Sequence, residues 1–111
     1  MRSSVLIGGS AIKRWNKMMS NIIPDKEKFG KENVDKEILR VGLIAELDAI
    51  NLYEQLAAMT DDEKIKKVLE DIADEEKTHV GEFLELLKRF DKKQIEEIEK
   101  GAKEVQEITG E

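Results

Sequence analysis

Apolar residues recur every three or four positions from residue 35 to near the C-terminus, and this period constrains the fold more than any other feature of the sequence. Such spacing places the apolar side chains on one face of an α-helix. No stretch shows the two-residue alternation that is typical of a half-buried strand. The sequence therefore predicts an all-α protein.

Three helices are predicted after the first third of the chain. Asp35 is the expected N-cap of the first, because its short side chain can accept a hydrogen bond from an unpaired N–H group. The stretches TDDE, residues 60–63, and DKKQ, residues 91–94, have the spacing of capping boxes that open the second and third helices. Gly110 ends the third. Because the link between the first two helices is short, we expect an antiparallel two-helix hairpin plus a short C-terminal helix.

The beginning of the chain differs from the rest in composition and shows no sustained period. It contains the Gly8–Gly9 pair and Pro24, the only proline, which interrupt regular structure. Residues 1–31 carry seven Lys or Arg against two Asp or Glu, whereas the remainder carries twelve against twenty-three. We interpret residues 1–33 as a flexible basic tail and linker before an acidic domain, residues 34–111.

Charge and composition exclude several classes of function. An acidic domain, in a chain with a net charge of -6, is not expected to bind nucleic acid. No run approaches the roughly 20 apolar residues that span a membrane. A short basic amphipathic helix around Trp15 could still lie on a partner or on a membrane surface, which is an alternative to the flexible tail. The chain has no cysteine, hence no disulfide or thiolate ligand, which fits a reducing cytoplasm.

Three polar residues interrupt the apolar stripes at one level of the predicted hairpin. Glu46 lies on the stripe of the first helix, and Glu76 and His79, the only histidine, lie three residues apart on the stripe of the second. Glu46 is about fourteen residues before the turn and Glu76 about sixteen after it, so at about 1.5 Å per residue the two carboxylates stand at similar heights. We therefore expect these side chains to converge.

A carboxylate in an apolar seam needs a counter-charge, and a bound cation would supply it. Two carboxylates and an imidazole suit iron, manganese or zinc. A di-iron four-helix bundle uses a lone Glu from each of two helices and a Glu-x-x-His pair from each of the other two, and this chain carries one of each. Two copies related by twofold symmetry would supply the whole set. The sequence thus predicts a ferritin-like four-helix bundle completed by homodimerisation, with the metal centre between subunits.

Each of these residues also has a simpler interpretation. Glu76 and His79 could be a chance pair on a Glu-rich helix, and Glu46 could be a rim carboxylate paired with lysine. Tyr53, seven residues after Glu46, could be a core residue with a hydrogen-bonded hydroxyl group, or it could stand beside the metal. The common height and phase of the three ligands favour a metal site over chance.

Two stretches of the sequence resemble the encapsulated ferritins, which are short ferritin-like proteins housed inside encapsulin nanocompartments. They are AELDAINLYEQ at residues 45–55 and ADEEKTHVGEF at residues 73–83, and the likeness extends over about residues 36–108. The resemblance implies a two-helix protomer that dimerises to build a di-iron ferroxidase centre. It further implies that the dimers assemble into an annular decamer.

The resemblance also implies roles for individual residues. Glu76 from each chain would bridge the two irons, with Glu46 and His79 as terminal ligands and Tyr53 close by in the active site. The protein would oxidise Fe²⁺ with dioxygen or peroxide. It would feed iron mineralisation and storage inside an encapsulin shell in the cytoplasm, because the solid protomer has no room for a mineral core.

The sequence departs from this family in two respects. Ala45 precedes Glu46, where some relatives have further acids near the entrance to the site, so that Asp48 is the remaining acid there. Relatives also carry a targeting peptide or a fused shell domain, whereas this chain stops at ITGE, which fits a shortened chain. The stretch VLIGGSAIKR near the N-terminus resembles a cargo peptide only loosely.

Two other functions remain open from the sequence alone. A rubrerythrin-like peroxide-reducing protein would use the same di-iron ligands, but it would need an external electron donor because the chain has no cysteine for a second iron site. A metal-free helical dimerisation module would use the apolar seam only for association. Metal analysis separates the second alternative, since such a module would purify without stoichiometric iron.

Overall fold

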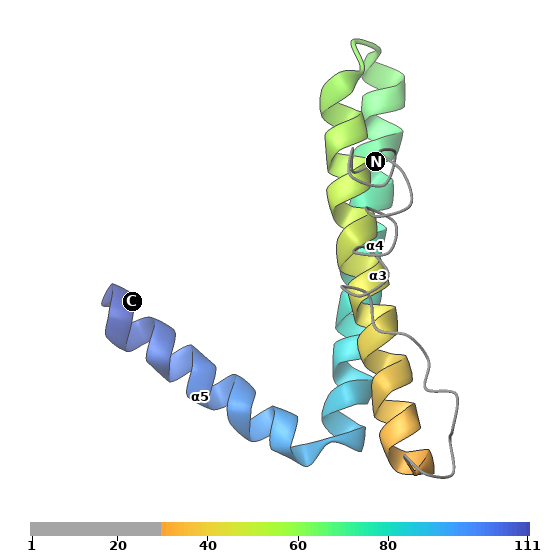
Figure 1. Ribbon diagram of the computed structural model, residues 1–111. Coiled ribbons are helices and arrows are strands. Elements are labelled where there is room, and N and C mark those ends of the chain that lie inside the picture. The colour runs from red at the N-terminus through yellow and green to blue at the C-terminus, as the bar shows by residue number, and fades with distance from the viewer. Residues whose placement is uncertain (1–29) are drawn as a thin grey trace, which may run out of the picture.

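The protein forms an antiparallel helical hairpin with a third helix that extends away from it. The computed structural model describes residues 30–111. Its helices are α3 (Lys31–Met59), α4 (Glu63–Phe90) and α5 (Lys92–Thr109). Figure 1 shows α3 and α4 side by side, with α5 leaving from the end of the hairpin opposite their connecting turn. No strand occurs in residues 30–111, so the predicted all-α class is confirmed.

The hairpin has a thin core. The buried apolar side chains of the described range are Val34 and Ala57 from α3, and Ala73 and Leu87 from α4. Two helices can bury only the stripe that each turns toward the other. Several large hydrophobic side chains therefore remain exposed.

The first helix begins earlier than predicted, so the proposed N-cap at Asp35 is wrong. Gly30 holds the N-cap position with a φ of 91°, in the left-handed region that glycine tolerates, and α3 begins at Lys31. The backbone N–H of Val34 already donates to the carbonyl of Gly30, at 3.1 Å. Asp35 thus lies inside the helix. The apolar period could not reveal this start, because the exposed residues Lys31 and Asn33 come before the first buried apolar side chain, Val34.

The second helix is capped by Asp62 and not by Thr60, which the capping-box pattern had favoured. The Oδ1 atom of Asp62 accepts from the backbone N–H groups of Lys64 at 2.9 Å and Ile65 at 3.0 Å. Thr60 is the C-cap of α3, and its Oγ1 atom accepts from the N–H of Asp62 at 3.1 Å. The negative charge of a carboxylate is also attracted to the positive N-terminal end of a helix, whereas a threonine hydroxyl group is neutral. The reversal itself is as short as predicted.

The third helix begins and ends where the sequence predicts, but its N-terminal capping box does not form. Asp91 is the N-cap of α5, and Gly110 ends it in the left-handed conformation. The side chain of Asp91 makes no capping hydrogen bond and instead accepts one from Nη2 of Arg40 at 3.1 Å. A bond between two charged groups is stronger than a bond to a backbone N–H. The ion pair ties α3 to the junction of α4 and α5.

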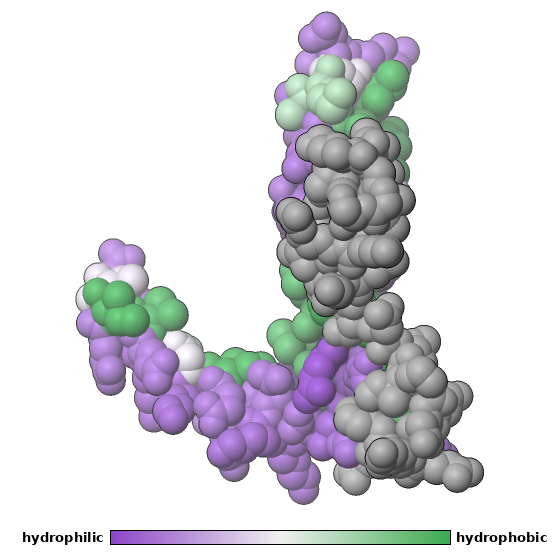
Figure 2. Space-filling view, in the orientation of Figure 1, coloured by the Kyte–Doolittle hydropathy of each residue, from purple (hydrophilic) through white to green (hydrophobic). Residues whose placement is uncertain are grey.

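The surface of α5 is divided between hydrophobic and hydrophilic residues, as its sequence period predicts. Figure 2 shows the hydrophobic colour along the side of α5 toward the hairpin and the hydrophilic colour along its other side. Among the hydrophobic residues of α5, Val105 is 56% exposed and Ile108 is 84% exposed.

Two predictions about the rest of the chain have different outcomes. The predicted tail and linker lie outside the described residues, apart from the short stretch that opens α3. Within the described helices, none has the length and apolar character that crossing a membrane requires.

Candidate metal centre

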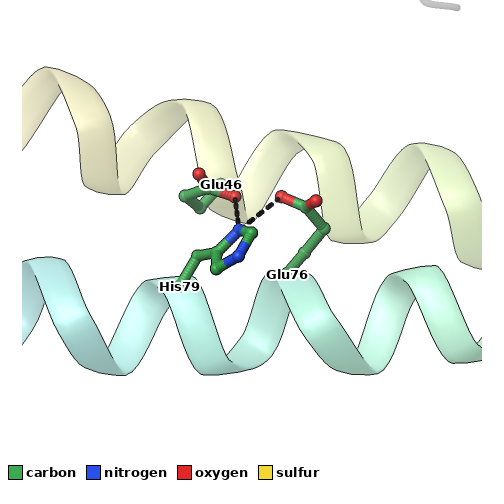
Figure 3. Close-up of side chains that lie close together, drawn as sticks. All are labelled: Glu46, Glu76 and His79. Atoms are coloured by element: carbon green, nitrogen blue, oxygen red, sulfur yellow. Dashed lines mark hydrogen bonds and ion pairs between the residues drawn. The ribbon is translucent and has the colours of Figure 1, made fainter.

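The side chains of Glu46, Glu76 and His79 converge between the two helices of the hairpin. Glu46 comes from the middle of α3, and Glu76 and His79 come from neighbouring turns of α4 (Figure 3). One ligand atom of each residue lies within 4.8 Å of the ligand atoms of the other two. The equal heights that the sequence predicts for these residues are therefore present in the fold.

His79 stands between the two carboxylates. Its Nδ1 atom lies 3.4 Å from Oε2 of Glu46 and 3.6 Å from Oε2 of Glu76, as the dashed lines in Figure 3 mark. The side chains of Glu46 and Glu76 are 20% and 19% exposed, whereas that of His79 is 43% exposed. The cluster is thus closed by the helices on one side and open on the side where the imidazole lies.

The surroundings of the cluster change the pKa values of Glu76 and His79. The pKa of Glu76 is raised, chiefly by a hydrogen bond with Glu46, and further by partial burial and the Glu46 charge. Partial burial alone would lower the pKa of His79, but the hydrogen bond and charge of Glu46, followed by those of Glu76, outweigh it and raise this pKa. A proton on Glu76 or His79 thus offsets part of the negative charge of the cluster, and a divalent metal cation would offset more of it.

The donor set fits a divalent transition metal. Two carboxylate oxygens and one imidazole nitrogen are ligands that iron, manganese and zinc accept. Three ligands from one chain leave part of the coordination sphere open for other donors. Within residues 30–111, this is the group of His, Asp and Glu side chains whose spacing could hold a metal ion.

Two other residues considered from the sequence lie outside this cluster. Tyr53 is half-buried on α3 and follows Glu46 by seven residues, about two helical turns. It is not one of the three clustered ligands, and its role in the active site stays a prediction. Asp48 follows Glu46 by two residues, which places it about 200° around the helix axis and away from the ligands.

The exposed hydrophobic residues of α4 all lie in phase with His79. Val68 and Phe90 are eleven residues from His79, Leu86 is seven away and Ile65 fourteen. These separations are close to whole numbers of helical turns. Their exposed fractions are 59% for Val68, 47% for Phe90, 42% for Leu86 and 52% for Ile65. The open side of the ligand cluster therefore lies on an apolar flank that runs most of the length of α4.

Comparisons in sequence find one family and two similar proteins. The family model described as EncFtn-like matches residues 21–102. A ferritin-like-encapsulin shell fusion protein of Pyrococcus furiosus is 57% identical over 89 residues, which are 80% of this chain and 26% of that protein. The encapsulin nanocompartment cargo protein EncC of Myxococcus xanthus is 38% identical over 71 residues, which are 64% of this chain and 55% of that protein. The chain thus spans less than two thirds of either relative.

A solved structure has the same fold. The crystal structure of the encapsulated ferritin domain from Pyrococcus furiosus superposes with a TM-score of 0.71 at 50% sequence identity, over 81% of this chain and 91% of that one. The family model includes the whole hairpin and all three clustered ligands. The chain belongs to the EncFtn-like family, as its resemblance to the encapsulated ferritins predicts.

Proposed function

We propose that this protein is a ferroxidase that binds Fe²⁺ at a di-iron centre shared between two copies of the chain. The observation that carries the proposal is the convergence of two carboxylates and one imidazole within 4.8 Å, on a flank left open to a partner. Iron is the substrate in this reaction. The two Fe²⁺ ions would each give up one electron, and dioxygen or peroxide would accept the pair.

Charge supports a centre with one metal ion per chain. Each hairpin contributes two carboxylates and one imidazole, so a symmetric dimer would gather four carboxylates and two imidazoles. Two divalent cations would neutralise the four carboxylates. Four ionised carboxylates without cations would repel one another in a partly desolvated seam, so a dimer joined at this cluster would need the two metal ions.

Hydrophobic burial supports a second copy as the occupant of the open flank. The exposed apolar residues of α4 extend on both sides of His79, and apolar surface of this kind gains free energy when a partner covers it. A twofold contact would bring the same flank of two hairpins together, with the two sets of ligands facing each other. The result would be a four-helix bundle with the metal centre inside.

The ligands would have different tasks in this centre. Glu76 from each chain would bridge the two ions, and Glu46 and His79 would be terminal ligands. Tyr53 would lie nearby. The carboxylates would stabilise the ferric product more than the ferrous substrate, because the extra positive charge strengthens their attraction. His79 would have to release its proton before it can bind, because only the neutral imidazole has a free lone pair for a metal.

An encapsulin shell is the proposed site of storage. The thin core of the hairpin offers no space for a mineral, so oxidised iron would have to accumulate outside the protein. Both similar proteins bear names that refer to encapsulin, one as a shell fusion and the other as a cargo. We propose on this basis that the chain works inside such a compartment, as a dimer that builds an annular decamer.

Anaerobic titration with Fe²⁺, followed by admission of air, tests the function. We expect one Fe²⁺ per chain, two per dimer, and rapid formation of ferric absorbance when air enters. Glu76→Ala and His79→Ala should slow this oxidation by roughly 100-fold or more, since even residues behind the ligands of metal sites contribute up to about 100-fold.

Glu75→Ala is the matched control for Glu76→Ala. Glu75 is an exposed neighbour that lies about 100° around α4 from Glu76, so its loss should leave most of the activity. Equal losses in the two variants would contradict the assigned face. Two irons on a chain that light scattering shows to be monomeric would contradict the shared centre, and purified protein that takes up no stoichiometric metal would point to a helical dimerisation module.

A further inference from the structure

Gly42 and Phe83 meet at an unusually close contact between α3 and α4. A Cβ atom built on Gly42 would lie 2.5 Å from Cε1, 2.7 Å from Cζ and 2.9 Å from Cδ1 of Phe83. Real Cβ atoms essentially never approach other atoms closer than 3.0 Å. The aromatic ring therefore occupies space that the side chain of any other residue at position 42 would need.

This contact distinguishes Gly42 from the other glycines inside the described helices. A Cβ atom built on Gly81 or Gly101 would meet nothing within 4 Å. Glycine inside a helix is less favourable than alanine, because it loses more backbone freedom when the chain folds. The close approach of Phe83 explains why a glycine occupies position 42 in spite of this disadvantage.

The contact lies next to the ligand cluster. Gly42 precedes Glu46 by four residues on α3, and Phe83 follows His79 by four residues on α4. Because the helices are antiparallel, both steps lead one turn in the same direction along the hairpin. The ring of Phe83 thus fills the layer beside the ligands, on the side toward Asp91 and α5.

We propose that Gly42 and Phe83 act as a spacer that sets the separation of α3 and α4 at the metal centre, which makes Phe83 a positioning residue for Glu46 and His79. With a Cβ atom at position 42, the ring or the helix would have to give by about 0.9 Å to reach an ordinary contact of 3.4 Å. Metal–ligand distances are held within about 0.2 Å. A displacement of the helices by even part of that amount would misplace the ligands.

The spacer has a second effect on the cluster. A half-buried aromatic ring in the adjoining layer keeps water out of that end of the seam. Water there would weaken the attraction between the carboxylates and a bound cation, because it screens charge. The inference rests on the proposed function, since the ring can position ligands only if they bind a metal.

Anaerobic titration with Co²⁺ tests the spacer, because the visible absorption of Co²⁺ reports coordination geometry as well as occupancy. In Gly42→Ala we expect Co²⁺ affinity to fall by about 10- to 100-fold, the range for residues that support metal ligands, and the absorption spectrum to change in shape. Circular dichroism below the melting temperature and light scattering should show a folded chain with the wild-type mass.

Gly81→Ala is the matched control, because it makes the same substitution in the same hairpin where nothing opposes the new methyl group. It should raise the melting temperature and leave both the affinity and the spectrum unchanged. Phe83→Leu keeps an apolar side chain but removes the far end of the ring, and on its own it should also weaken Co²⁺ binding. In the double variant Gly42→Ala with Phe83→Leu, the methyl group occupies the vacated space, so affinity and spectrum should recover toward wild type.

The outcomes separate this inference from the proposed function. Wild-type protein that binds no Co²⁺ would overturn both. Wild-type binding with an unchanged affinity and spectrum in Gly42→Ala would show that the ring swings aside, and it would overturn the spacer alone. A smaller mass for metal-free Gly42→Ala than for metal-free wild type, compared at a protein concentration high enough for the wild type to dimerise, would assign the contact to subunit association and not to ligand positioning. Recovery of the melting temperature without recovery of Co²⁺ affinity in the double variant would likewise count against positioning.

Discussion

The acidic side chains on the two long flanks of the hairpin have different positive partners. On the flank opposite the ligand cluster, the ammonium group of Lys77 lies 3.1 Å from a carboxylate oxygen of Glu54 and 3.5 Å from one of Asp74. The hydrogen bond and charge of Glu54 raise the pKa of Lys77, so this cation stays charged. All three side chains are at least half exposed. These acids have a permanent cation within their own chain.

The acids of the ligand cluster have only a histidine as a possible positive partner. Glu46 and Glu76 are about one fifth exposed, and their partner His79 is charged only when it is protonated. The pKa of Glu76 is raised, as expected for a carboxyl group without a permanent counter-charge. Partial burial combined with a titratable partner, and not the number of acids, thus distinguishes a candidate metal site from a solvated ion-pair network.

Removal of metal should change the association state more than any other treatment, because it removes the cation that the cluster lacks. Wild-type protein without metal should be largely dissociated, and anaerobic Fe²⁺ should at least double its mass, since metal that binds only the dimer drives association by mass action. In Glu76→Gln one partly buried acid per chain is gone, so the metal-free form should associate more readily and the response to iron should be lost. Light scattering coupled to size-exclusion chromatography measures both.

A mass distribution that does not change with metal or with Glu76→Gln would contradict this prediction. It would mean that the dimer forms through contacts elsewhere, such as the exposed apolar residues of α5. The ligand cluster would then not drive association.

The pH dependence of stability should be the next largest difference between the flanks. The folded-state pKa values of Glu76 and His79 are raised above their ordinary values of 4.5 and 6.5. Such groups stabilise the metal-free fold fully below the ordinary value, and this contribution is lost as pH rises through the raised value. The melting temperature of the metal-free protein should therefore fall, relative to Glu76→Gln, as pH rises from 4.5 through the raised pKa values of the two groups.

The stabilisation that bound metal provides should change with pH in the opposite direction, because metal competes with protons for the same ligands. The increase in melting temperature that Co²⁺ produces should grow as pH rises through the same range. Thermal melts at several pH values, with and without Co²⁺, give both quantities. An increase that is independent of pH would mean that the bound metal does not displace protons from the cluster.

The smallest effect is expected from the opposite flank. Glu54→Gln removes one partner of Lys77, but Asp74 remains, and exposed ion pairs contribute little to stability. Melting temperature and Co²⁺ affinity should both match the wild type within error. A loss of Co²⁺ affinity comparable to that of Glu76→Gln would show that the two flanks are coupled, and it would remove the distinction drawn between them.

The sequence was sufficient to predict the helices and the meeting of the three ligands, because both depend on regular geometry. A fixed rise per residue and a short turn determine which side chains of an antiparallel pair share a level. Because Glu46, Glu76 and His79 lie on the facing stripes at equal height, an antiparallel hairpin brings their side chains together. The dimer and the iron chemistry are not settled by the same arithmetic and remain predictions.

The helix ends and the close contact at Gly42 were harder to predict, because they depend on competition between individual side chains. Asp91 has the sequence context of a capping residue, but Arg40, far away in the chain, takes its carboxylate. Asp62 caps α4 because Thr60 is already engaged at the end of α3. Gly42 appears in the sequence only as a gap in an apolar stripe. That an aromatic ring fills the gap depends on the position of Phe83 in space.

The angle between α5 and the hairpin gives the molecule a long lever. At about 1.5 Å per residue, the 18 residues of α5 reach about 27 Å from their junction at Asp91. A rotation of about 10° at this junction would move the far end of the lever by about 5 Å, which is the length of one helical turn. Contacts made through its tip would close into a ring only if every copy holds the same angle. The ion pair between Arg40 and Asp91 lies at this pivot, where a small change of angle has its largest effect at the tip.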